Sequence, residues 1–151
     1  MPSERSRYLK NRPSPPVNFL NFKKLLIEES PERLSSLLMI AGQKFKPLRN
    51  ALYIICGAKQ FEQFADHKLL EETLLFAVKL DDFVSYDNAG AYSIVTDELV
   101  DFFKKNKKGN KLDQKLLKIL ERVIPQLESS AELLQDENSW FAAVDELRAL
   151  T

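Results

Sequence analysis

The sequence predicts a mainly α-helical, compact fold of about six or seven helices, and three observations lead to this class. Apolar residues recur with helical spacing along most of the chain, for example at Leu48, Ala51, Leu52 and Ile55. Only 4 of the 151 residues are glycine, which is too few for the many turns of an all-β fold. Hydrophobic residues at 44% and charged residues at 29% are ordinary values for a globular domain of this length.

The first 16 residues differ in composition from the rest of the chain. They hold four prolines and a net charge of +3, from Arg5, Arg7, Lys10 and Arg12 against Glu4. Few of them are apolar, so they offer little surface for a core. We predict a flexible, basic, proline-containing tail over residues 1–16 and a single helical domain over residues 17–151.

Three helices are expected in the first part of this domain, over residues 17–29, 31–43 and 47–56. Ser30 is a favourable N-cap and is followed by a proline, which fits the first position of a helix. Gly57 is expected to end the third helix, because glycine is common just beyond a helix C-terminus.

The most apolar helical pattern of the chain covers residues 66–84, and Asp66 is the expected N-cap. Its apolar arc spans about half of the helix circumference, so this helix should contact neighbours on more than one side. Beyond it the period changes to an alternation that includes residues 91–95, after Asn88 and Gly90. This pattern predicts a β-hairpin near residues 83–95, with a helix–loop–helix as the alternative.

The C-terminal part is expected to contain three further helices. The first begins at Thr96 and ends before Gly109, and the helix dipole accounts for the lysines in its last turns. The second follows Lys111, and Pro125 should kink or end it. The third carries Trp140, which we interpret as a packing anchor rather than a stacking platform.

Charge is unevenly distributed although Lys+Arg and Asp+Glu both number 22. Residues 1–59 hold 11 basic and 4 acidic side chains, whereas residues 60–151 hold 11 basic and 18 acidic ones. Within the acidic part, four cations repeat at helical spacing, namely Lys111, Lys115, Lys118 and Arg122. Phosphates could lie along this stripe, and a solvated helix face is the alternative.

Several chemistries lack the residues that they need. A single histidine and a single cysteine exclude a disulfide framework and the common zinc sites, and no glycine-rich phosphate loop occurs. We therefore expect no enzymatic activity, no metal and no cofactor. Cys56 lies in an apolar run and is expected to be a buried thiol. A single cysteine also favours a reducing compartment. We therefore expect a soluble, cytoplasmic protein without a membrane-inserted segment.

The order of elements over residues 47–103 resembles that of a winged-helix domain. Residues 60–65 would be the first helix of the helix-turn-helix, the helix after Asp66 the recognition helix, and residues 87–90 the tip of the wing. The would-be recognition helix is acidic, with Glu71, Glu72, Asp81 and Asp82. Phosphate contact needs the opposite sign, so the resemblance implies a protein partner in place of a DNA groove.

Two functional hypotheses follow. The first is a helical protein–protein interaction module, an adaptor or assembly subunit, that contacts another protein or a second copy of the chain through Tyr53, Tyr86 and Tyr92. The second is a nucleic-acid-binding regulator that uses the basic stripe together with Arg5, Arg7 and Arg12 of the tail. A site for a small apolar ligand between helices is a third alternative.

Overall fold

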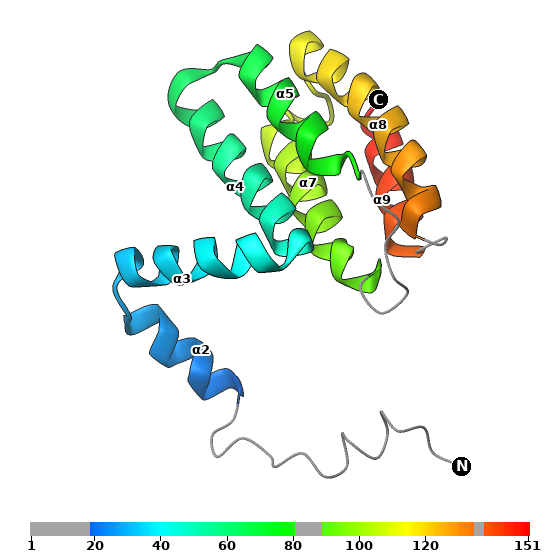
Figure 1. Cartoon of the computed structure of the whole chain (residues 1–151). Coiled ribbons are helices and arrows are strands. Elements are labelled where there is room, and N and C mark those ends of the chain that lie inside the picture. The colour runs from blue at the N-terminus through cyan, green and yellow to red at the C-terminus, as the bar shows by residue number, and fades with distance from the viewer. Residues whose placement is uncertain (1–18, 81–88, 135–137) are drawn as a thin grey trace, which may run out of the picture. The chain divides into compact units, whose positions relative to one another are not determined.

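Helices account for nearly all of the described chain (Figure 1). The computed structural model describes residues 19–80, 89–134 and 138–151. These residues form seven α-helices and two 3₁₀ turns, which confirms the mainly helical class. The chain divides into two compact units, residues 1–38 and residues 39–151, which we call the N-terminal unit and the bundle unit. The predicted tail, residues 1–16, lies outside the described residues.

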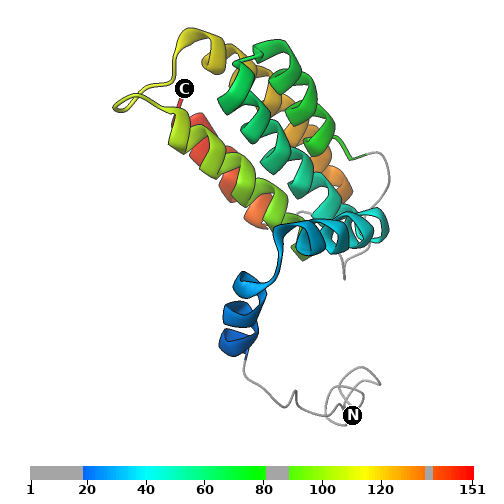
Figure 2. The same cartoon turned by 90° about the vertical axis from the view of Figure 1, so that its left-hand side faces the viewer.

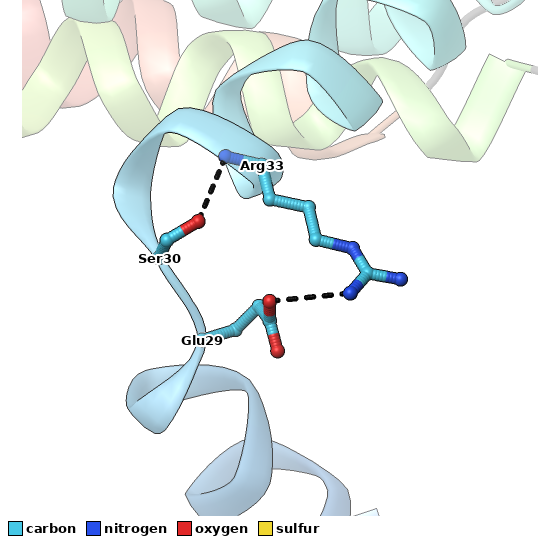
Figure 3. A network of polar contacts seen from close by, with 3 residues as sticks. All are labelled: Glu29, Ser30 and Arg33. Atoms are coloured by element: carbon cyan, nitrogen blue, oxygen red, sulfur yellow. Dashed lines mark hydrogen bonds and ion pairs between the residues drawn. The ribbon is translucent and has the colours of Figure 1, made fainter.

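The described part of the N-terminal unit consists of α2 (Phe19–Glu28) and the first turns of α3 (Pro31–Lys44). Figure 3 shows the junction between these helices. The Ser30 hydroxyl accepts a hydrogen bond from the backbone N–H of Arg33 at 3.2 Å, and the Arg33 guanidinium donates to Glu29 at 3.4 Å. This geometry confirms the predicted restart of the helix at Ser30 and Pro31.

The bundle unit contains α4 (Lys46–Phe64), α5 (His67–Val78), α7 (Ser93–Asn106), α8 (Gln114–Ala131) and α9 (Asn138–Arg148). Packing proceeds in a cycle, from α4 to α5, then to α8, α9, α7 and back to α4. The five helices thus close a ring, whose members are seen side by side in Figures 1 and 2. Side chains from every helix fill its interior, and the largest of the fully buried ones is Trp140.

The corner between α4 and α5 confirms one prediction and corrects another. Ala65 adopts a left-handed conformation with φ of 51°, and the Asp66 carboxylate accepts from the backbone N–H of Leu69 at 3.0 Å, as expected for an N-cap. Gly57, however, does not end a helix, because α4 continues to Phe64. A Cβ atom at Gly57 would lie only 2.8 Å from Cγ2 of Thr73, so the glycine permits close approach of α5.

The predicted second strand, residues 91–95, is wrong. The 3₁₀ turn Gly90–Tyr92 leads directly into α7, and Thr96, the predicted N-cap, lies inside that helix with its hydroxyl donating to the Ser93 carbonyl at 3.0 Å. Tyr92, Val95 and Leu99 are all buried, so the helical spacing of the buried residues prevails over the local alternation. The first strand and most of the turn, residues 83–88, lie outside the described residues.

This correction also bears on the winged-helix resemblance. Residues 90–95 are helical where a wing strand would be needed, and residues 60–64 belong to the long helix α4 rather than to a separate short helix. The part of the chain that the structure describes therefore does not show the winged-helix order of elements.

Pro125 does not end the helix, because α8 continues through this residue to Ala131. Its buried face, which includes Leu120, Val123 and Leu127, packs within the ring and stabilises the helix on both sides of the proline. Trp140 is fully buried and its indole N–H donates to the Leu127 carbonyl at 2.7 Å, which confirms its role as a packing anchor.

Candidate functional site

The three tyrosines selected from the sequence do not form one surface. Tyr53 on α4 is 38% exposed, and its ring meets that of the exposed Phe76 on α5 edge-on, with a centroid separation of 5.3 Å. Tyr92 is only 4% exposed and packs against the Trp140 ring at 6.3 Å, which makes it a core residue. Tyr86 lies outside the described residues. The Tyr53–Phe76 pair is thus the aromatic surface that remains.

The basic stripe is shorter than its sequence spacing indicates. Lys115, Lys118 and Arg122 lie on the exposed side of α8, whereas Lys111 precedes the N-cap of this helix. Arg122 forms an ion pair with Glu71 of α5 at 2.6 Å, so its charge is neutralised within the bundle unit. The tail arginines, Arg5, Arg7 and Arg12, lie outside the described residues.

A second group of lysines meets the stripe at the connection between α7 and α8. Lys108 and Lys111 form an isolated antiparallel bridge around Gly109, which has a positive φ of 65°. We define the lysine turn as Lys105, Lys107, Lys108, Lys111 and Lys115. The helix dipole does not account for all lysines before Gly109, because α7 ends at Asn106 and Lys107 and Lys108 lie beyond its last residue.

Lys104, just before the lysine turn, has a different environment. Its ammonium group donates to the Glu146 carboxylate of α9 at 2.8 Å. This hydrogen bond, and then the charge of the same carboxylate, raises the pKa of Lys104 above the usual lysine value. Lys104 therefore links two helices of the ring and is not counted in the lysine turn.

The N-terminal unit exposes the largest apolar side chains of its described helices. These side chains form what we call the N-terminal apolar face: Phe22, Leu25, Leu26, Ile27, Leu37 and Leu38. A groove of about 270 Å³ lies on the same two helices, lined by Phe22, Lys23, Leu26, Ile27 and Leu34. The sequence showed the helical spacing of these residues, but such spacing does not tell whether another part of the chain covers the face.

Catalytic or metal-binding groupings are not evident among the described residues. No cluster of three or more histidine, cysteine, aspartate or glutamate side chains there is arranged to hold a metal ion. Cys56 is exposed on α4, contrary to the expected buried thiol, because it lies on the outward side of a helix whose inward side is formed by residues such as Ile54. None of the helices in the described ranges has the length and apolar character needed to cross a membrane.

Comparison with protein-family models, with curated proteins and with solved structures found no match to this chain. Two surfaces stand out by their chemistry, the N-terminal apolar face and the lysine turn, and they belong to different units of the chain.

Proposed function

We propose that this protein is a non-enzymatic protein–protein interaction module that binds an apolar helical segment of a partner protein on its N-terminal apolar face. The observation that supports the proposal is the exposure of apolar side chains along the groove: Ile27 is 73% exposed and Leu26 is 53% exposed, and both line the groove together with Phe22. Soluble monomers rarely expose a contiguous apolar patch beyond a few hundred square ångströms.

Burial of this face would release a substantial free energy. Each square ångström of apolar surface removed from water contributes about 25 cal/mol, and a large aliphatic or aromatic side chain about 1.5–3 kcal/mol when fully buried. The exposed side chains that line the groove, Phe22, Leu26 and Ile27, therefore offer several kilocalories per mole to a partner, before the entropic cost of association. The groove between α2 and α3 supplies the concave shape that binds an amphipathic helix.

The charges of the N-terminal unit indicate the chemistry of this partner. The described residues of α2 and of the first turns of α3 carry three cations, Lys23, Lys24 and Arg33, and three anions, Glu28, Glu29 and Glu32. Over residues 19–38 these charges cancel, although Lys23 lines the groove, so the unit as a whole does not favour a strongly charged partner. We infer an uncharged, apolar helix face as the binding segment. The single cysteine supports a reducing compartment, and we propose the cytoplasm.

The test compares what the full chain and its variants retain from a cell extract. Leu26→Asp and Leu38→Asp each place a charge on the N-terminal apolar face, whereas Ser35→Asp places the same charge on an exposed polar position of α3. We expect a partner to be retained by the wild-type chain and by Ser35→Asp, and to be lost from both leucine variants. Circular dichroism checks that helix content is unchanged.

Two results would contradict the proposal. Equal retention by all four proteins would show that binding does not involve this face. Light scattering that detects a dimer of the wild-type chain, dissociated by Leu26→Asp and Leu38→Asp, would assign the face to a second copy instead of a different protein.

A further inference from the structure

The connection between α7 and α8 concentrates positive charge. Residues 104–118 include seven lysines and a single acidic residue, Asp113. Asp113 is engaged as the N-cap of α8, where its carboxylate accepts from the backbone N–H of Leu116 at 2.8 Å. Within the described residues, only Lys104 of these seven lysines has an ion-pair partner. The other six form no ion pair there, although Lys105 lines a pocket together with Glu62, Glu98 and Asp101.

The backbone of the turn brings two of these lysines together. Lys108 donates from its N–H to the Lys111 carbonyl at 2.8 Å, and Lys111 donates back to the Lys108 carbonyl at 3.3 Å. Such a mutually bonded antiparallel pair has Cα atoms about 5.5 Å apart, with both side chains on one face. Like charges placed opposite each other are destabilising, so the folded chain alone gains nothing from this pair. An anion between the two ammonium groups would remove that repulsion.

The positive line continues onto α8. Lys115 and Lys118 are exposed there, and at a rise of 1.5 Å per residue they lie about 5 Å apart along the helix axis. The line ends one turn later at Arg122, which Glu71 neutralises. In Figure 2 the connection from α7 to α8 projects from one end of the bundle, where an extended polyanion can reach it.

The exposed apolar side chains near the lysine turn help to decide whether a nucleic acid or a membrane surface is its anionic partner. No large hydrophobic side chain is exposed between residues 95 and 134, a range that the structure describes completely. The end of α4, where Phe61 contacts Phe102 of α7, carries one exposed aromatic side chain, Phe64. Surface attachment to lipid generally combines basic residues with buried apolar groups or a lipid chain, and the lysine turn offers charge alone. Lysine contacts phosphate as a point charge, and such contacts carry no sequence information.

We propose that the lysine turn is a second binding site, which binds the phosphate backbone of a nucleic acid without sequence specificity. This site goes beyond the proposed protein-docking function and does not depend on it, because it lies wholly in the bundle unit. Relative to the stripe expected from the sequence, it gains Lys105, Lys107 and Lys108 and leaves out Lys118 and Arg122. Together, the two sites would let the module attach an apolar protein partner to a nucleic acid.

The experiment measures the fluorescence anisotropy of a labelled 20-nucleotide single strand of mixed sequence, titrated with the full chain. The double variant Lys108→Glu/Lys111→Glu is compared with Lys24→Glu/Lys68→Glu, which changes the net charge equally at exposed lysines elsewhere. We expect at least a tenfold weaker affinity for the turn variant and less than a threefold change for the control. Circular dichroism shows whether both remain folded.

The salt dependence provides a second readout. Each lost phosphate contact reduces the slope of log K against log salt by about 0.7 for a single strand, so the turn variant should lose roughly 1.4 relative to the wild-type chain. Equal weakening in both double variants, an unchanged slope, or no binding at 50 mM salt would overturn the proposal. Phosphatidylserine vesicles are the comparison ligand: turn-dependent binding to vesicles without binding to the oligonucleotide would assign the site to lipid and overturn it as well.

Discussion

Both units of the chain have helices with an apolar side, but apolar side chains that are buried in the bundle unit have exposed counterparts in the N-terminal unit. In the bundle unit Leu99 is 0% exposed at the centre of a helical apolar stripe, whereas in the N-terminal unit Leu37 is 54% exposed on a helix of the same length. Helical spacing thus identifies the apolar side of a helix in both units. Whether that side is covered depends on the number of neighbouring helices.

The ring arrangement explains how the bundle unit buries most of its apolar side chains within itself. Each of its five helices packs against at least two others, so most of a wide apolar arc is covered, although Leu69 and Phe76 on α5 remain exposed. In the N-terminal unit, none of the side chains from Phe22 to Leu38 is buried, and Glu29 and Leu34 are the half-buried ones. The bundle unit should therefore account for most of the stability of the chain, and the N-terminal unit for little of it.

The largest effect on stability is expected at Trp140. Replacement by alanine leaves a cavity among α7, α8 and α9 and removes the hydrogen bond to the Leu127 carbonyl. We expect the free energy of unfolding to fall by about 3–5 kcal/mol. Urea denaturation followed by far-UV circular dichroism measures this, and a loss below about 1 kcal/mol would contradict the role of Trp140 as a packing anchor.

A smaller effect is expected at Ser130, the polar residue that joins α8 to the end of α5. Its hydroxyl donates to the Val78 carbonyl at 2.7 Å and accepts from the Leu80 N–H at 3.4 Å, and both bonds are buried. Ser130→Ala would leave these backbone groups without a partner, at a cost of about 1–3 kcal/mol. The neighbouring Ser129 is exposed, so Ser129→Ala should change stability by less than about 0.5 kcal/mol. Similar urea midpoints for the two variants would argue against the bridge.

The close approach of α4 and α5 can be tested at Gly57. The Ala side chain of Gly57→Ala would meet Cγ2 of Thr73, and we expect a net loss of about 1–2 kcal/mol after the gain in helix propensity. Thr73→Ser removes that methyl group and keeps the hydroxyl, which donates to the Leu69 carbonyl at 2.8 Å. The double variant should recover most of the loss in a double-mutant cycle, whereas simple additivity of the two changes would exclude the steric cause.

The smallest effect is expected on the N-terminal apolar face. Leu37→Ala and Leu38→Ala remove side chains that are about half exposed, so each should change the free energy of unfolding of the isolated chain by less than about 1 kcal/mol. Leu120→Ala, on a fully buried leucine of α8, is the matched control and should cost about 2–5 kcal/mol. Equal losses at the exposed and the buried leucines would remove the distinction between the two units.

The sequence was sufficient for features that depend on local chemistry. Ser30 with Pro31, and Asp66 with the N–H groups of its first turn, are capping arrangements that act within four residues. The role of Trp140 as a packing anchor could also be predicted from the sequence, because a large amphipathic ring in an apolar stripe is usually buried.

Features that depend on distant residues were not accessible in this way. Gly57 faces Thr73 of the next helix, so its role as a contact point rather than a helix end required the tertiary structure. Tyr92 was expected on the surface and is buried, whereas Cys56 was expected to be buried and is exposed. Burial depends on which face of a helix meets the ring. Likewise, Glu71 neutralises Arg122 across 51 positions of sequence, which shortened the basic stripe.

Hydrogen–deuterium exchange of the full chain, at a concentration where light scattering shows a monomer, tests the contrast between the two units most directly. We expect amides of α8 to exchange only through global unfolding, and amides of α2 to exchange orders of magnitude faster, because few buried contacts hold that helix. Protection of α2 equal to that of α8 would contradict the account, since it would show that the N-terminal helices are already stabilised without a partner.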